Sequence, residues 1–92
     1  KKVVVVTGGS EGIGEACVEI FNQRDYEVIN LDIEASSRQI VRNNTWFIQT
    51  DISKVDEIQS AFNKISQKYS HIDVLVSNAG WGEREQKIDV LL

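Results

Sequence analysis

The residues best suited to binding a charged ligand form a glycine-rich stretch near the N-terminus, Thr7-Gly8-Gly9-Ser10-Glu11-Gly12-Ile13-Gly14. It follows four valines and leads into an amphipathic segment, so the expected order is strand, turn and helix. A helix that starts beside such a turn presents free backbone N–H groups and the positive end of its dipole. Because glycines let a ligand approach the backbone closely, the stretch predicts a site for the diphosphate of a dinucleotide.

Two other interpretations of these glycines have to be weighed. A Walker A phosphate loop needs Lys and then Ser or Thr after its last glycine, but Glu15 and Ala16 follow Gly14. The glycines could also join a strand to a helix without binding anything. The spacing Gly-x-x-x-Gly-x-Gly after a valine-rich strand is rarer than a lone glycine turn, and residues further along the chain agree with a ligand site.

Asp32 is the first of these residues, at the end of a second apolar segment. A carboxylate there can accept hydrogen bonds from both hydroxyls of an adenosine ribose and would repel a 2′-phosphate. Glu11 adds a second negative charge near the same place. The residue after Asp32, Ile33, is not basic. These residues favour NAD over NADP, although a strand-end acid is also a common solvated surface residue.

Asp51 and Ile52 follow a third apolar segment and have two interpretations. The Asp51 carboxylate could accept a hydrogen bond from the adenine amino group while Ile52 packs on the ring. Alternatively, Asp51 could simply help to start the helix that follows it. The residues alone leave both interpretations open.

The elements that must position these residues alternate along the chain. Strands are expected at residues 3–7, 26–31, 45–50 and 73–76, and helices at residues 12–24 and from Ser53 onward. Residues 34–43 could be a loop or a short helix, 82–87 a polar loop or helix start, and 88–92 a strand or a helix. Because no hairpin dipeptide separates the strands, the alternation predicts βαβ units and a parallel sheet in one α/β domain spanning residues 1–92.

Each helix has an apolar stripe that should face the sheet. In the first helix the stripe comprises Ile13, Ala16, Cys17, Ile20 and Phe21, and Asp25 should end the helix. In the second it comprises Val55, Ile58, Ala61, Phe62, Ile65 and Tyr69. We expect Ser53 to cap this second helix, with Asp56 at the acidic position of a capping box.

Taken together, the motifs resemble the short-chain dehydrogenase/reductase family, in family order and over nearly the whole chain up to Gly80. They are the glycine stretch, Asp32, Asp51-Ile52 and Ile72-Asp73-Val74-Leu75-Val76-Ser77-Asn78-Ala79-Gly80. The resemblance implies a Rossmann-like three-layer fold, strand order 3-2-1-4, and a bound NAD in extended form. The parent reaction would then be hydride transfer between NAD(H) and an alcohol or ketone.

The resemblance also implies a role for each matching residue. The diphosphate side would be held by Gly8, Ser10, Glu11, Gly12, Ile13 and Gly14, with Ile13 near the nicotinamide end. Asp32, with Ile33 beside it, would take the adenosine ribose, and Asp51 and Ile52 the adenine. The adenine-ribose wall would be lined by Asn78, Ala79 and Gly80.

The chain departs from the family pattern in two respects. Ser77 stands where Asn is commoner, which is a mild change. The family's catalytic Tyr-x-x-x-Lys pair is absent, because Tyr26 and Tyr69 are followed four residues later by Asn30 and Asp73. We therefore assign no catalytic residue and expect the 92-residue chain alone to be inactive.

Composition excludes several other classes of protein. A net charge of −4 provides no basic surface for nucleic acid. One Cys and one His are too few for a metal site of the usual kinds, and a single Cys fits a reducing, cytoplasmic location. No apolar run approaches the roughly 20 residues that span a bilayer, so no membrane association is expected.

The ends of the chain suggest a fragment or an engineered piece, since there is no initiator Met and the last residues are apolar. The sheet would then end at its fourth strand, whose free edge invites association. Either residues 88–92 fold back as an extra strand, or two copies pair edge to edge as a homo-oligomer. The alternative to an oxidoreductase fragment is a non-catalytic nucleotide-binding or engineered half-Rossmann module.

Overall fold

The computed structural model describes residues 1–35, 44–78 and 89–91, and in them a single five-stranded sheet. The strands are β1 (Val3–Thr7), β2 (Glu27–Asp32), β3 (Thr45–Gln49), β4 (Val74–Ser77) and β5 (Asp89–Leu91), in the order β3-β2-β1-β4-β5. The first four strands are parallel, as predicted, in the predicted order 3-2-1-4. β5 pairs antiparallel with β4.

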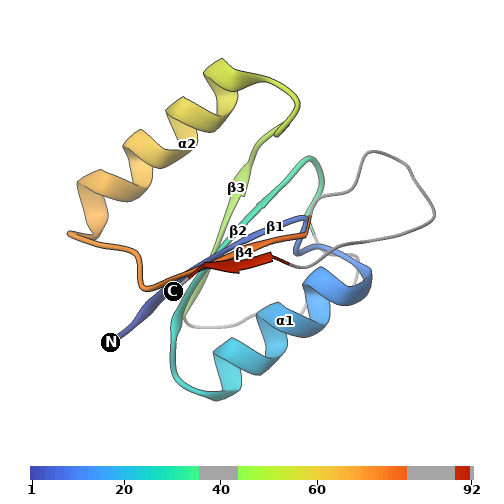
Figure 1. The fold of residues 1–92 in the computed structure, drawn as a ribbon, viewed down its shortest axis with the longest axis vertical. Helices are drawn as coiled ribbons and strands as arrows, with labels where there is room; N and C mark the ends of the chain where they lie inside the picture. The colour runs from blue at the N-terminus through green and yellow to red at the C-terminus, as the bar shows by residue number, and fades with distance from the viewer. Residues whose placement is uncertain (36–43, 79–88, 92) are drawn as a thin grey trace.

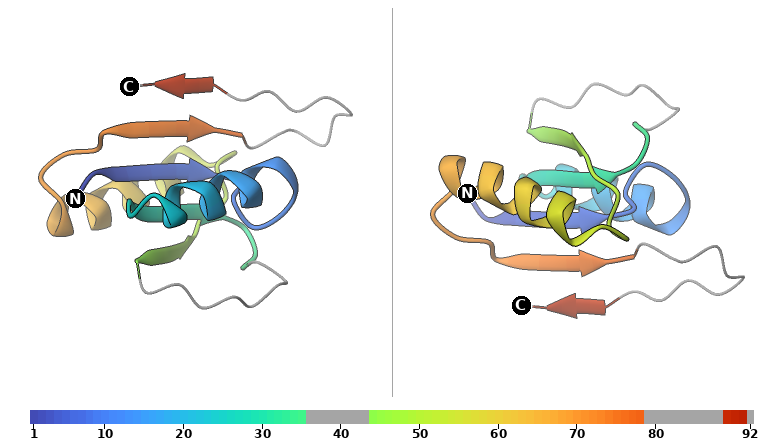
Figure 2. Two further views of the ribbon diagram at one scale, coloured as in Figure 1. Left: turned by 90° about the horizontal axis from the view of Figure 1, so that it is seen from below. Right: turned by 90° about the horizontal axis from the view of Figure 1, so that it is seen from above.

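Two helices, α1 (Gly12–Gln23) and α2 (Val55–Lys68), cover opposite faces of this sheet (Figure 1). Figure 2 shows the same arrangement from the two helix sides, with the strands side by side behind each helix. The chain moves one way across the sheet from β1 to β2 and the other way from β3 to β4. Because parallel crossovers are right-handed, these opposite directions place the helices on opposite faces and make three layers.

The sheet is buried on both faces, which explains its continuous apolar strands. Along β1, Val3 and Val5 belong to the cluster under α2, whereas Val4 and Val6 belong to the cluster under α1. All four are 3% exposed or less. The strand therefore needs no polar face, and the valine run that precedes the glycines is the centre of the core.

The stripe predicted for α1 is confirmed at Cys17 and Phe21 and wrong at the exposed residues Ile13, Ala16 and Ile20. Gly14 and Val18 are the buried residues, and Cys17 and Phe21 pack against the same cluster. Ile13 and Ile20 are 44% and 49% exposed. Gly14 lies on the packed face of α1, against the glycine turn. Because it has no side chain, the hydrophobic pattern of the sequence does not reveal this.

The start of α2 also differs from the prediction. The N-cap is Lys54 and makes no side-chain capping bond, while the Ser53 hydroxyl donates instead to Asp51. Val55, expected in the buried stripe, is 78% exposed because it is the first residue of the helix. The later part of the stripe is confirmed: Ala61 and Ile65 are buried, and Phe62 and Tyr69 pack against them.

The end of α1 is a Schellman motif that was only partly foreseen. The Asp25 N–H donates to Asn22 O and the Tyr26 N–H to Phe21 O, both at 3.1 Å. Asp25 takes a left-handed φ of 65°. The rings of Phe21 and Tyr26 meet edge to face at 4.9 Å, which supplies the apolar contact typical of this motif.

Asp25→Gly should therefore stabilise the protein, by about 0.5–1 kcal/mol. A side chain in the left-handed region is strained, and glycine removes that strain at some cost in chain entropy. The exposed Lys1–Asp25 ion pair that would be lost is worth little. The free energy of unfolding from urea titration measures the gain. Asp25→Ala, which keeps a Cβ and loses the carboxylate, should not stabilise.

Of the two outcomes considered for the C-terminal residues, the structure shows the fold-back. Asp89, Val90 and Leu91 pair with Ser77, Val76 and Leu75 of β4. The predictions for residues 36–43 and 82–87, and the site residues Ala79 and Gly80, lie outside the described residues. Neither described helix is long and apolar enough to cross a membrane.

Candidate functional site

The glycine turn connects β1 to α1 at the carboxyl end of the parallel strands, and β2 holds its first three N–H groups. The Gly8 N–H donates to Leu31 O at 2.8 Å, and the Gly9 N–H to Asn30 Oδ1 at 2.9 Å. The Ser10 N–H donates to Asp32 Oδ2 at 3.0 Å. The turn is therefore built onto the neighbouring strand, and these three donors already have protein acceptors.

The N–H groups that remain for a ligand are those of the first turn of α1. Gly8 and Gly12 have φ values of 68° and 61°, which a residue with a Cβ rarely adopts, and so bring the chain sharply into the helix. Glu11 is the N-cap and makes no side-chain capping bond. The first N–H groups of a helix have no intrahelical acceptor, so this end is suited to an anion.

Gly14 allows α1 to sit directly against the turn and the end of β4. A Cβ at Gly14 would lie 2.0 Å from Gly8 O and 2.5 Å from Asn78 Nδ2. The Asn78 carboxamide donates to Gly8 O at 3.2 Å, and the Asn78 N–H donates to Thr7 Oγ1 at 3.0 Å. Asn78 thus joins β4 to the turn.

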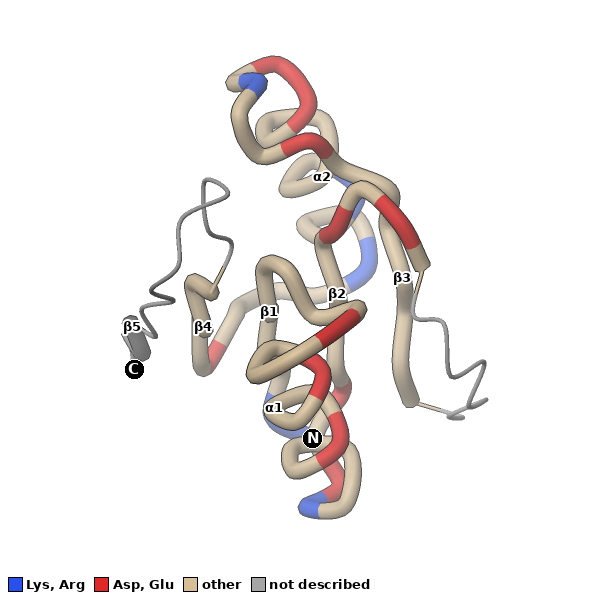
Figure 3. Tube along the Cα trace, turned by 90° about the vertical axis from the view of Figure 1, so that its right-hand side faces the viewer, with Lys and Arg blue, Asp and Glu red and all other residues tan. Residues whose placement is uncertain are grey.

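Beside the turn lies an open pocket of about 280 Å³, lined by Ser10, Glu11, Asp32, Ile33, Glu34 and Ala35. Its size is near the lower end of small-molecule sites. Three of the lining residues are acids and none is basic, and Figure 3 shows acidic segments gathered at this turn and beyond the end of β2. The pocket therefore suits a neutral, hydroxyl-bearing group better than a second phosphate.

Asp32 lines this pocket and is held in a fixed orientation. Its Oδ2 accepts from the Ser10 N–H, and its Oδ1 accepts from the Ile33 N–H at 2.7 Å. Each carboxylate oxygen can accept more than one hydrogen bond, so both keep capacity for a ligand hydroxyl. Ile33 is 55% exposed and lines the pocket, consistent with a residue that contacts a ligand.

Ser10 lines the pocket, but its side chain is directed toward the protein. The residue is buried, and its hydroxyl accepts from Asn30 Nδ2 at 3.0 Å and donates to Glu34 O. Ser10 therefore organises the turn, and its side-chain hydrogen bonds are made within the chain.

Asp51 lies after β3 and starts the turn into α2. Its Oδ1 accepts from the Ser53 hydroxyl at 2.6 Å and from the Ser53 N–H at 3.0 Å, while its own N–H donates to Glu57. The Ser53 hydroxyl, then the Ser53 N–H and Lys54, hold the pKa of Asp51 below its ordinary value. Of the two interpretations of Asp51, the helix-starting role has direct geometric support.

Ser53→Ala should raise the pKa of Asp51, because the hydroxyl is the main group that lowers it. A lowered folded-state pKa stabilises the protein above the ordinary value of 3.8 and ceases to do so as pH falls through the lowered value. Between the lowered value and 3.8, the stability of the variant should therefore depend less on pH than that of the wild-type protein. Carbon-13 NMR titration of the Asp51 carboxyl measures the pKa, and an unchanged pKa would contradict the assignment.

The residue that the sequence analysis did not single out is Asn30. It is 5% exposed, and its carboxamide contacts both Gly9 and Ser10. The available signal was a polar residue within the apolar strand Val28-Ile29-Asn30-Leu31. A buried amide needs partners, so such a residue indicates a specific contact.

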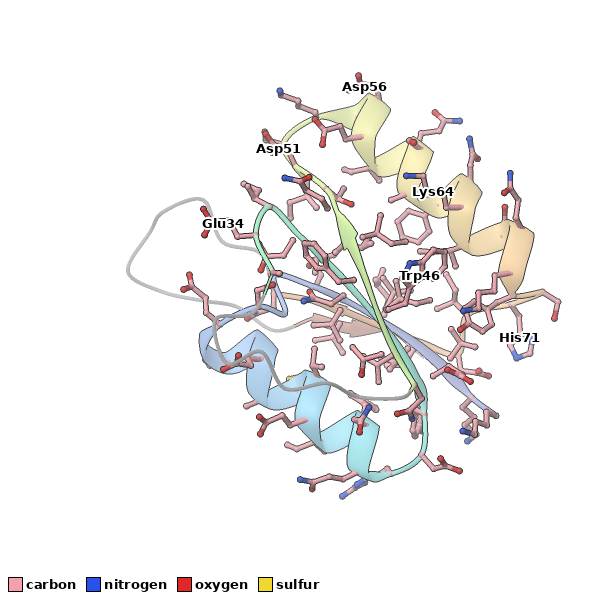
Figure 4. The ribbon with its side chains drawn as sticks, turned by 180° about the vertical axis from the view of Figure 1, so that it is seen from behind. Glu34, Trp46, Asp51, Asp56, Lys64 and His71 are labelled. Carbon is pink, nitrogen blue, oxygen red and sulfur yellow. The ribbon has the colours of Figure 1, made fainter. Side chains whose placement is uncertain are left out.

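The only histidine lies at the other end of the molecule. His71 is exposed and contacts Asp73 and Ser70, with Nε2 3.3 Å from Asp73 Oδ2. Figure 4 shows it far from Glu34 and Asp51, which lie together on the side of the strand ends. In the described part of the chain, no three His, Cys, Asp or Glu residues are grouped so that they could hold a metal ion.

This fold, with its glycine turn and strand-end acid, defines a dinucleotide-binding α/β protein. The family model described as "short chain dehydrogenase" matches residues 2–91. The chain belongs to the short-chain dehydrogenase family.

Individual relatives agree with this assignment. The chain is 36% identical to an NAD-dependent glycerol dehydrogenase from Listeria innocua, over 97% of this chain and 37% of that protein. A short-chain dehydrogenase structure from Leptospira borgpetersenii with bound NAD⁺ matches with a TM-score of 0.81 and 35% identity, covering 87% of this chain and 32% of that one. A structure of ElxO with NADP bound matches with a TM-score of 0.77 and 32% identity, covering 87% of this chain and 35% of that one.

Two consequences follow from these similarities. The chain spans about a third of the length of the relatives that it matches. Because similar structures hold either NAD⁺ or NADP, the fold alone does not choose between the two cofactors. That choice depends on the residues around the pocket.

Proposed function

We propose that this chain is the NAD-binding portion of a short-chain oxidoreductase whose parent reaction transfers hydride between NAD(H) and an alcohol or ketone. The observation that carries the proposal is the position of Asp32. Its carboxylate is fixed by two backbone N–H groups at the edge of an acid-lined pocket, beside the N-terminus of α1. This arrangement supports a ribose acceptor next to a diphosphate site.

Each part of the cofactor then has residues to hold it. The diphosphate would lie over the first turn of α1, where Gly12, Ile13 and Gly14 present backbone N–H groups. The adenosine ribose would bind Asp32, with Ile33, Glu11 and Glu34 around it. When bound, the nicotinamide supplies the hydride acceptor or donor.

The adenine and the opposite wall involve the other predicted residues. Asp51 follows β3 on the same side of the molecule as Glu34 (Figure 4), and Ile52 is the next residue, so a site for the adenine at Asp51 and Ile52 remains part of the proposal. Asn78 carries a buried Oδ1 that has no hydrogen-bond partner among the described residues. An unpaired buried acceptor is costly, and a donor supplied with the cofactor would satisfy it. Ala79 and Gly80 are proposed to continue this wall.

We propose that these 92 residues do not supply the proton-transfer group of the reaction, because neither Tyr26 nor Tyr69 is followed four residues later by Lys. Tyr26 packs on Phe21, at the C-terminal end of α1, and Tyr69 contacts the core under α2. We therefore propose that the 92 residues bind cofactor without turning over substrate, and that the chemistry belongs to further chain.

The proposal is tested by calorimetric titration with NAD. Wild-type protein should bind NAD, and the complex should not oxidise alcohols. Absence of binding at millimolar NAD would overturn the proposal. Oxidation of an alcohol by the 92 residues alone would overturn the proposal that the catalytic residues lie outside them.

A further inference from the structure

The buried carboxamide of Asn30, within β2, contacts the glycine turn of the candidate site. Asn30 is flanked in sequence by Ile29 and Leu31, both essentially fully buried, and pairs in register with Val6 of β1. A polar side chain in such an apolar strand lowers stability unless its hydrogen bonds are satisfied. Its presence therefore calls for a specific reason.

The carboxamide joins two consecutive residues of the glycine turn. Oδ1 accepts from the Gly9 N–H at 2.9 Å, and Nδ2 donates to Ser10 Oγ at 3.0 Å. Ser10 in turn uses its hydroxyl on Glu34 O and its N–H on Asp32 Oδ2. One amide thus connects the turn to the residues that line the pocket.

The fit between Asn30 and the turn is also steric. A Cβ at Gly9 would lie 2.5 Å from Asn30 Oδ1 and 2.8 Å from Val18 Cγ2. The φ of Gly9 is not in the left-handed region, so the close approach of Asn30 and Val18, and not backbone conformation, requires glycine there. The turn is held against the amide at a distance that no larger residue allows.

We propose that Asn30 is a positioning residue of the cofactor site, an inference that rests on the proposed function. By fixing Gly9 and Ser10, it sets where the chain enters α1 and hence where the N–H groups of the first helical turn point. Through Ser10 it also sets the distance between those donors and Asp32. Its main effect is on binding of the diphosphate, because Asp32 keeps a second donor, the Ile33 N–H, that does not depend on the turn.

The test compares two ligands, NAD and adenosine, since only NAD carries the diphosphate. In Asn30→Ala the dissociation constant for NAD should rise about tenfold, as expected from the loss of two hydrogen bonds that shape the site. The dissociation constant for adenosine should change less than about threefold. A purely structural role would not alter the ratio of the two constants.

Asn22→Ala is the matched control. Asn22 also donates two side-chain hydrogen bonds, to Asn44 Oδ1 and Thr45 Oγ1, but it ties the C-terminal end of α1 to the start of β3. This variant should lose stability while leaving the NAD-to-adenosine ratio unchanged. A shifted ratio in Asn22→Ala would contradict the proposal, because loss of stability alone would then be enough to shift the ratio.

The outcomes separate this inference from the proposed function. If wild-type protein binds no NAD, the proposed function fails. If wild type binds NAD and Asn30→Ala binds it equally well, or loses NAD and adenosine affinity in the same proportion, the positioning role is overturned. If Asn30→Ala does not fold, Ser10→Ala removes one of the two hydrogen bonds of the Asn30 carboxamide. In this variant the ratio of the NAD and adenosine dissociation constants should shift about threefold. An unchanged ratio would overturn the positioning role of Asn30.

Discussion

Gly14→Ala is expected to lower the free energy of unfolding by about 3 kcal/mol, a large part of the roughly 5–15 kcal/mol typical of a domain. The added Cβ would lie 2.0 Å from Gly8 O and 2.5 Å from Asn78 Nδ2. Relief of this overlap requires α1 to move away from the turn, or the turn to move away from β2. Either movement breaks hydrogen bonds that form the proposed site.

The sign of this effect is informative, because Gly→Ala inside an ordinary helix stabilises it by about 1 kcal/mol. Urea unfolding followed by circular dichroism measures the change. Ala16→Ser, at an exposed position of the same helix, should change stability by less than about 0.5 kcal/mol. A Gly14→Ala protein as stable as wild type would show that α1 does not pack on the turn in this way.

The second large effect is expected on cofactor preference. Wild-type protein should bind NAD at least about tenfold more tightly than NADP, and in Asp32→Ala the two dissociation constants should agree within about threefold. The 2′-phosphate of NADP would enter a pocket whose charged lining residues are Glu11, Asp32 and Glu34. Within the described part of the chain, Asp32 is the one of these three whose carboxylate is oriented by backbone donors.

Titration calorimetry with both cofactors, at one fixed salt concentration, measures the preference. Asp56→Asn removes the same charge from the exposed first turn of α2, outside the pocket, and should leave the preference as it is in wild type. Equal binding of NAD and NADP by wild-type protein would refute the role of Asp32. A preference that survives in Asp32→Ala would transfer that role to Glu11 and Glu34.

The sequence by itself determined the first four strands, the two helices and the class of ligand, but left residues 88–92 open between strand and helix. Period and composition suffice for the first four strands, since short, β-branched apolar runs bounded by glycine and polar segments are typical of buried strands. Asp32 could be placed because it follows such a strand, and the carboxyl ends of parallel strands meet at one edge of the sheet.

The packed faces of the helices were less accessible to sequence reasoning. Hydrophobic periodicity put Ile13 and Ile20 on the buried side of α1, whereas Gly14 and Val18 occupy it. A glycine contributes nothing to a hydrophobic pattern. Yet α1 contacts the turn most closely at Gly14, where no side chain separates them. Likewise, Ser53 was the expected cap of α2, but its hydroxyl bonds Asp51 before the helix begins.

Only the tertiary structure decided which polar groups act together. Asn30 and Gly9 are far apart in sequence, and their contact depends on the register that pairs β1 with β2. The same register brings the Ser10 N–H to Asp32. The sequence predicts each element because propensity and periodicity depend only on neighbouring residues. Hydrogen bonds between elements depend instead on how the strands align. The residues proposed to bind the ligand could thus be named from the sequence, whereas the amide proposed to position them could not.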